Sequence, residues 1–173
     1  MGMQLIETIE VGSGGAASIE FTGIPQDGVD LQLVLSGRSD RNYINDYISI
    51  TLNGDTVSTN YTRRFLVGDS TTATSVSASD QLLGYGINGS TSSANTFGNA
   101  SIYISNYTSA TAKSISADVV QENNTSAQYY AYQTIVASSY SGTSAITQLL
   151  LNPGSLSAFV QYSTASLYKI TAD

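Results

Sequence analysis

Apolar residues recur at every second position through most of this chain of 173 residues. The pattern is clearest at Leu31, Leu33 and Leu35, which are separated by single residues of other types. Because the side chains of a β-strand point alternately to its two faces, each such run predicts a strand with one face on a core and the other in water. Similar runs cover 19–21, 48–52, 100–104 and 115–119, and further strands are expected near 4–11, 81–87, 129–137, 145–151 and 159–170.

Turn-forming residues separate these runs, and no stretch shows the period of a capped helix. In Asn53-Gly54-Asp55, for example, Asn and Gly both accept the positive φ of a type I′ turn. We therefore predict an all-β fold: a single-domain antiparallel β-sandwich that is jelly-roll-like. An immunoglobulin-like sandwich is disfavoured, because the chain is longer than the usual ~100 residues and lacks Cys and Trp.

Three parts of the chain are distinguished by their sequence. Residues 1–11 are expected to form an N-terminal arm or strand, and 12–173 the β-sandwich domain. The stretch 68–94 is rich in Ser, Thr, Ala and Gly and has one short apolar patch, so it is expected to be a long surface excursion of the domain.

The chain is poor in charge, which argues against several classes of partner. Only 11% of its residues are charged, against about 25% in a typical domain, and the net charge is −7. Six Lys and Arg residues are too few and too scattered to follow a nucleic acid backbone. No apolar run reaches the ~18 residues of a membrane span. Residues 1–11 hold no basic residue, so we expect a protein made in a cytoplasm and used without an export signal.

The sequence also lacks His and Cys, the two commonest catalytic and metal-binding residues. We expect no enzyme, no catalytic residues, no cofactor and no metal. Two alternatives stay open. Calcium could be bound by the oxygens of Asp27 with Asp30, Asp40 with Asp46 and Asn53 with Asp55, although such residues also dominate turns. A hydrolase acting on sugars would need two carboxylates, drawn from Glu7, Glu10, Glu20, Asp118 and Glu122.

Tyrosine is the dominant aromatic residue, with twelve Tyr against four Phe and no Trp. Tyr combines apolar area with a polar tip, which suits subunit or partner contacts and sugar stacking, and it is also a good strand former. Contacts with a partner, ordinary packing in the sandwich and a carbohydrate platform all remain open. The candidate interface residues are Tyr43, Tyr47, Tyr129 and Tyr130, together with Leu5, Ile6, Ile9 and Val11 of the N-terminal segment.

Arg63 and Arg64 are consecutive in an apparent strand, so their side chains point to opposite faces. One of them is expected to be partly buried, and a buried guanidinium requires a carboxylate or several carbonyl groups. We predict an inter-strand or inter-subunit ion pair, with Asp40, Asp46 or Asp118 as the acidic partner.

Three segments together resemble a known class of protein. They are IEVGSGGAASIEFTGIP (9–25) followed by DLQLVLSGR (30–38), TFGNASIYISNY (96–107) with KSISAD (113–118), and FVQYSTASLYKI (159–170). The set is similar to small virion proteins of tailed bacteriophages, particularly cyanophages and other marine phages, among which such chains are found as capsid decoration (cement) proteins. The resemblance spans nearly the whole chain, and it carries no catalytic residues.

The resemblance implies a jelly-roll-like fold, a homotrimer and a non-enzymatic function. The chain would bind the major capsid protein on the outer surface of the assembled virion and stabilise the shell, after synthesis in the cytoplasm of the bacterial host. The N-terminal segment 1–11 is the expected contact with the shell or with a neighbouring copy. The alternative function is a tail or head-fibre tip that binds host-surface glycans through the tyrosine clusters and the 68–94 excursion.

Overall fold

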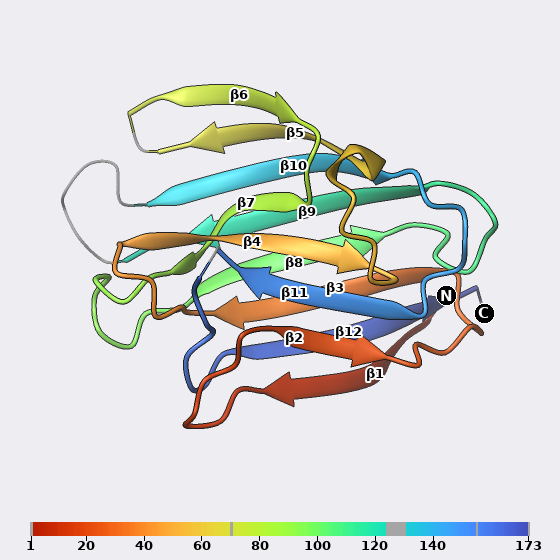
Figure 1. Ribbon diagram of the computed structural model, residues 1–173, viewed down its shortest axis with the longest axis horizontal. Helices are drawn as coiled ribbons and strands as arrows, with labels where there is room; N and C mark the ends of the chain where they lie inside the picture. Colours follow the sequence, from red (N-terminus) through yellow and green to blue (C-terminus); the bar gives the residue numbers. More distant parts are fainter. Residues whose placement is uncertain (1, 70, 124–130, 155, 173) are drawn as a thin grey trace.

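The computed structural model describes residues 2–69, 71–123, 131–154 and 156–172, and these form two antiparallel sheets packed as a sandwich. The larger sheet has the order β1-β12-β3-β8-β9-β10-β5-β6, and the smaller one the order β2-β11-β4-β7 (Figure 1). A 3-10 turn, η1 (Ser58–Asn60), precedes β5. The strands are β1 (Gly2–Glu10), β2 (Ile19–Thr22), β3 (Asp30–Gly37), β4 (Asn45–Leu52), β5 (Tyr61–Gly68), β6 (Ala73–Ala78), β7 (Leu82–Asn88), β8 (Gly98–Ile104), β9 (Lys113–Gln121), β10 (Tyr132–Tyr140), β11 (Gln148–Pro153) and β12 (Thr164–Thr171).

Five strand pairs are nested in the sequence, as if one long hairpin had been folded over into two sheets. β5 pairs with β6, β4 with β7, β3 with β8, β2 with β11 and β1 with β12, all antiparallel. The β9–β10 hairpin is inserted between β8 and β5. The chain alternates between the two sheets from β1 to β5 and again from β10 to β12, as in a jelly roll. The predicted all-β, jelly-roll-like sandwich is therefore confirmed.

The core lies between the two sheets and is built from the alternating residues of the sequence pattern. Leu31, Leu33 and Leu35 of β3 face inward and are at most 1% exposed. Ile48 and Ile50 of β4 approach from the opposite sheet and are equally buried. The residues that alternate with the three leucines on β3 are exposed or half-buried. Burial of apolar side chains on only one face of each sheet therefore determines the register in which these strands pair.

The larger sheet extends beyond the smaller one. In Figure 1, β5 and β6 lie above β7, the last strand of the smaller sheet. β6 lies within 68–94, the stretch expected to be a surface excursion, and the expected strand near 81–87 is β7. Two strands therefore lie within the segment that the sequence describes as a surface excursion. The sequence pattern did not predict β6, because most of its residues are exposed on both faces of the strand. A strand without a buried face needs no alternation of apolar and polar residues.

The N-terminal segment is not a detached arm. β1 pairs along its whole length with β12, from Gly2 opposite Thr171 to Glu10 opposite Thr164, and forms one edge of the larger sheet. The register shifts between Leu5 and Glu7, which marks a β-bulge at Ile6. The strand continues into the sandwich through Val11, whose side chain is 3% exposed.

The Asn53-Gly54 turn has the predicted conformation but a different role. Both residues have positive φ, 51° and 69°, and the amide of Asp55 donates to the carbonyl of Leu52 at 3.0 Å. The strands on either side of this turn belong to different sheets. The turn therefore carries the chain out of β4 and toward β5 in the other layer, and it does not close a β-hairpin.

Candidate binding surfaces

An apolar corner lies at the β1 edge of the larger sheet. On the outer face, Leu5 of β1 lies opposite Tyr168 of β12, and Met3 lies opposite Ile170. Leu5 and Met3 are 55% and 61% exposed. Large side chains at this exposure remain available to cover an apolar surface of another molecule. We call these four residues the β1 corner.

The four candidate residues of the N-terminal segment therefore have different environments. Leu5 belongs to the β1 corner and faces solvent. Ile6 and Ile9 are half-buried and contact the core, and Val11 is a core residue. The sequence pattern could not separate them, because the bulge at Ile6 interrupts the alternation on which such an assignment depends.

The outer face of the larger sheet is broad, and its charged residues are few. Three exposed apolar side chains, Val34, Leu66 and Ile135, lie in a single row across the sheet with Asp118 as its one charged member. The row reads Thr8, Ser166, Val34, Ser101, Asp118, Ile135, Leu66, Ser75 from β1 to β6. Ser101 and Asp118 separate Val34 from the other two, and Ile135 and Leu66 lie directly opposite each other. This row therefore holds one exposed apolar pair, whereas the β1 corner brings four large side chains together.

A stack of three tyrosines joins the two sheets at the β7 edge. The ring of Tyr85 on β7 lies 4.5 Å from that of Tyr47 on β4 and 4.8 Å from that of Tyr132 on β10, measured between ring centroids. The hydroxyl groups of Tyr47 and Tyr85 are hydrogen bonded at 3.0 Å. Burial and this hydrogen bond raise the pKa of Tyr47 to about 12. Because the rings cover one another, sugar stacking on the central ring is disfavoured, and the stack acts as packing between the layers.

Arg41 extends this stack toward solvent. Its guanidinium carbon lies 5.5 Å from the ring centroid of Tyr47 and 5.3 Å from that of Tyr43, and one of its nitrogens lies 3.2 Å from the carboxylate of Asp46. Tyr43 is 55% exposed, so it is the accessible tyrosine of this group. Tyr129 and Tyr130, the other two candidates, lie outside the described residues.

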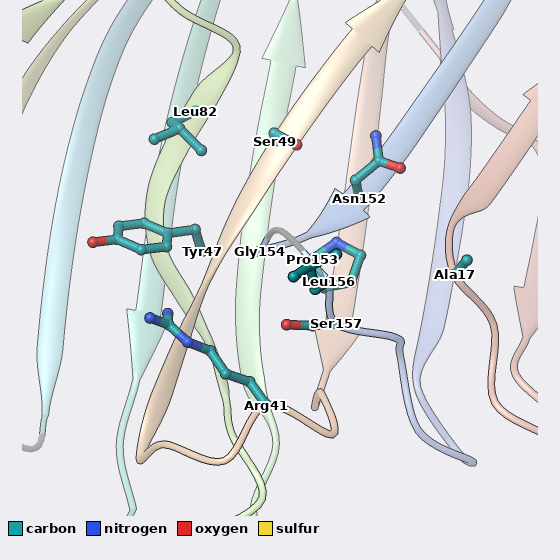
Figure 2. Close-up of a pocket in the computed structure, with 10 residues that line it drawn as sticks. All are labelled: Ala17, Arg41, Tyr47, Ser49, Leu82, Asn152, Pro153, Gly154, Leu156 and Ser157. Atoms are coloured by element: carbon teal, nitrogen blue, oxygen red, sulfur yellow. The ribbon is translucent and has the colours of Figure 1, made fainter.

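A hollow of about 710 Å³ lies over the outer face of the smaller sheet, beside Arg41 and Tyr47 (Figure 2). Ser49 of β4 and Asn152 of β11 contribute polar groups, and Leu82 contributes an apolar wall. Pro153, Gly154, Leu156 and Ser157 also line the hollow, and Leu156 is fully exposed with a φ of 66°. An aromatic ring beside hydroxyl, amide and guanidinium groups is the composition of a small-ligand site.

The Asp46 carboxylate is enclosed beside this hollow. Its Oδ1 accepts hydrogen bonds from the amide of Tyr47 at 2.8 Å and from Arg41, whereas its buried Oδ2 has no hydrogen-bond partner. A Cβ placed on Gly154 would lie 2.0 Å from Oδ1. The carboxylate therefore requires glycine at position 154, because any side chain there would occupy its space.

A second cleft, of about 380 Å³, lies under the overhanging β5 and β6 strands. Phe65 and Val67 line it from β5, and Arg63, which is 8% exposed, lies at the same surface and stacks on Phe65 with its guanidinium carbon 4.1 Å from the ring centroid. Arg63 forms two hydrogen bonds to Asp80, one of them 2.9 Å long. The prediction of one buried, ion-paired arginine is confirmed.

The predicted acidic partners of Arg63 were wrong. Asp80 follows β6, and it reaches Arg63 because the β5–β6 pairing places Ala78 directly opposite Arg63. The sequence alone gave no sign of β6, so it could not bring Asp80 to this position. Asp46 instead pairs with Arg41, and Asp118 lies on the outer face of the larger sheet.

The other acidic residues considered as calcium ligands make protein contacts. Asp27 pairs with Lys169. Asp30 accepts hydrogen bonds from the hydroxyl of Tyr103 and from the amide of Asn106. Within the part of the chain that the structure describes, no three acidic side chains converge in a way that could hold a metal ion. The same part contains no helix with the length and apolarity needed to cross a membrane.

Comparisons with known proteins show a distant likeness among solved structures. No family model matches the chain, and no curated protein matches it. Among solved structures, the chain is similar to an exo-inulinase from Aspergillus awamori, with a TM-score of 0.39 and 13% identity over 99% of this chain. The match covers 29% of the inulinase chain. A likeness of this degree carries no argument about activity.

Proposed function

We propose that this chain is a non-enzymatic capsid decoration protein of a tailed bacteriophage. It binds the major capsid protein on the outer surface of the assembled shell as a symmetric oligomer. The observation that carries the proposal is the β1 corner, in which Leu5 and Met3 are exposed on an edge strand that is held by its pairing with β12. The resemblance of the sequence to phage virion proteins supplies the identity of the partner.

Stabilisation of the shell follows from mass action. A molecule that binds the assembled lattice and not free subunits lowers the free energy of the lattice by an amount that grows with its concentration. Burying the β1 corner contributes through apolar area, at about 25 cal/mol for each Å² removed from water. No member of the β1 corner is charged, so the apolar contact itself should depend little on salt.

The proposal is tested by mixing the purified chain with capsids that lack it and measuring co-sedimentation. Leu5→Glu places a charge in the β1 corner and should reduce occupancy at least tenfold. Gln133→Glu is the matched control, because it adds the same charge to the outer face on β10, far from β1. Equal binding by both variants and the unaltered chain would exclude the β1 corner, and no binding by any of them would exclude the function.

A second candidate function is the binding of host-surface glycans. The hollow beside Tyr47 favours it, because Arg41, Ser49 and Asn152 offer hydrogen bonds of the kind that sugar hydroxyls use. Binding to an array of bacterial surface glycans, abolished by Asn152→Leu and retained by Leu5→Glu, would support this candidate over the decoration proposal.

A further inference from the structure

β6 forms the second edge of the larger sheet and carries none of the features that keep edge strands from pairing. Its six residues, ATSVSA from Ala73 to Ala78, include no charge and no proline, and five of the six are exposed. It pairs with β5 in unbroken register, so no bulge turns the edge away. Among the residues that the structure describes, no further strand pairs with the backbone groups on its other side. An edge of this kind is a template for the addition of another strand.

The opposite edge of the same sheet is built differently. β1 carries Glu7 and Glu10, and its register shifts at the bulge beside Leu5. Charged side chains and bulges are the devices by which natural sheets block edge-to-edge association. The sheet therefore has one protected edge and one open edge.

We propose that the β6 edge pairs with β6 of a second copy of this chain, antiparallel, about a two-fold axis at Val76. In this register Val76 lies opposite the second copy's Val76, and Ser75 lies opposite the second copy's Ser77. Every opposed pair within the strand is uncharged, and two β-branched apolar residues meet at the axis. A register centred on Ser75 would lose this Val–Val contact.

Charges at the ends of the strand are compatible with this pairing. Two acids lie next to this edge. Asp80 would lie opposite the second copy's Thr72, and the carboxylate of Asp69 accepts hydrogen bonds from Thr71 and Thr72 of its own chain. The charge of Asp80 is balanced by Arg63 of its own chain, at a nitrogen-to-oxygen distance of 2.9 Å. Two strands in this register therefore bring no pair of unbalanced like charges directly opposite each other.

The association is expected to be weak. A six-residue edge buries less than the ~800 Å² per partner of a standard interface. Each copy also carries a net charge of −7, and two such copies repel. We expect a Kd of about 10–100 μM, with tighter pairing at higher salt because screening removes the repulsion.

Pairing at β6 gives the dimer two β1 corners, one at each far end of the joined sheets. This consequence rests on the proposed function: with two docking sites, one dimer would bridge two capsid subunits and gain from avidity. An association through identical edges closes at two copies. The inference therefore departs from the trimer that the sequence resemblance implies.

Cysteine cross-linking tests the register directly, because the chain has no Cys of its own. Val76→Cys, oxidised at about 200 μM, should give a disulfide-linked dimer, since directly opposed Cβ atoms lie ~4.5–5.5 Å apart. Ser75→Cys and Ser77→Cys are matched controls whose thiols would be offset along the strands, and they should stay monomeric. Cross-linking of Ser75→Cys in place of Val76→Cys, or equal cross-linking of all three, would overturn the proposed axis.

Sedimentation of the unaltered chain provides the second measurement. Its mean mass should rise toward that of two copies between about 10 and 300 μM, whereas Val76→Lys should stay monomeric and the interior-strand control Ser101→Lys should behave like the unaltered chain. A monomer at every concentration, or a trimer that Val76→Lys leaves intact, would refute the pairing. Capsid binding by a chain that never dimerises would refute this inference alone, and a dimer that binds no capsid would refute only the function.

Discussion

Arg63 and Asp80 hold the overhanging edge of the larger sheet against β7. Arg63 projects inward from β5, its guanidinium group lies over Phe65, and two hydrogen bonds join it to the carboxylate of Asp80 at the start of the connection to β7. The same carboxylate accepts a hydrogen bond from the amide of Leu82 at 3.0 Å. One ion pair thus links β5, β6 and β7 at the place where the smaller sheet ends.

Replacing Asp80 by Ala should destabilise the fold strongly, because the guanidinium of Arg63 would remain buried without its counter-charge. We expect a loss of about 3 kcal/mol in the free energy of unfolding, measured by urea denaturation. Asp118→Ala, on the open outer face, is the control and should change stability by less than about 0.5 kcal/mol. Similar losses in the two variants would show that the ion pair contributes nothing specific.

Asp69 should make stability depend on acid pH. Hydrogen bonds from the amides of Thr72 and Thr71 lower the pKa of Asp69 to about 2. A carboxylate whose pKa is lowered on folding stabilises the protein above its unfolded pKa of about 3.9. That contribution is lost as the pH falls through about 2. Urea midpoints of the unaltered chain and of Asp69→Asn should therefore differ at pH 6, and the difference should shrink as the pH falls from about 4 through about 2. A difference independent of pH would contradict this assignment.

The hydroxyl of Tyr61 joins the two sheets. It accepts a hydrogen bond from the amide of Leu52 and donates one to the carbonyl of Asp55, both at 3.0 Å, and the side chain is fully buried. Tyr61→Phe leaves the Leu52 amide buried without a partner and should cost about 1–3 kcal/mol. Tyr43→Phe, at an exposed position, should be nearly neutral in the same thermal or urea unfolding experiment.

Gly154→Ala should also destabilise the protein. The new Cβ would occupy the position of Oδ1 of Asp46, so the carboxylate would have to move away from the amide of Tyr47 and from Arg41. Overpacking of this kind costs about 1–3 kcal/mol. At Gly12 no atom lies within 4 Å of an added Cβ, and Gly12→Ala should be neutral or slightly stabilising. If Gly154→Ala were equally harmless, the close contact with Asp46 would be ruled out.

Strands with one buried face were predictable, and strands without one were not. β3 and β8 have the strict alternation that burial against a second sheet imposes, and the sequence locates both. β6 has no sheet opposite it, and it is stabilised by hydrogen bonds to β5, which leave no trace in the side-chain pattern. The alternation of apolar residues reports only which side chains are buried. It therefore does not reveal a strand that is stabilised by backbone hydrogen bonds without a buried face.

The sequence also predicted only part of the candidate binding surfaces. The sequence pointed to Leu5 and Tyr43 as candidate interface residues, and the side chains of both are exposed. It grouped Ile9 and Val11 with Leu5, although the bulge after Leu5 changes which face of the strand the following side chains occupy. The position of a bulge depends on the partner strand, so the spacing of apolar residues in β1 does not reveal it. It also missed Tyr85 and Tyr132 as partners of Tyr47, since three strands far apart in sequence bring these rings together.

Cryo-electron microscopy of the intact virus particle tests the central claim most directly. The account predicts this jelly roll at regularly repeated sites on the outer surface of the capsid, with the β1 edge of the larger sheet against the major capsid protein. Density for the chain confined to the tail or to a single vertex would contradict the decoration function, and so would its complete absence from the particle.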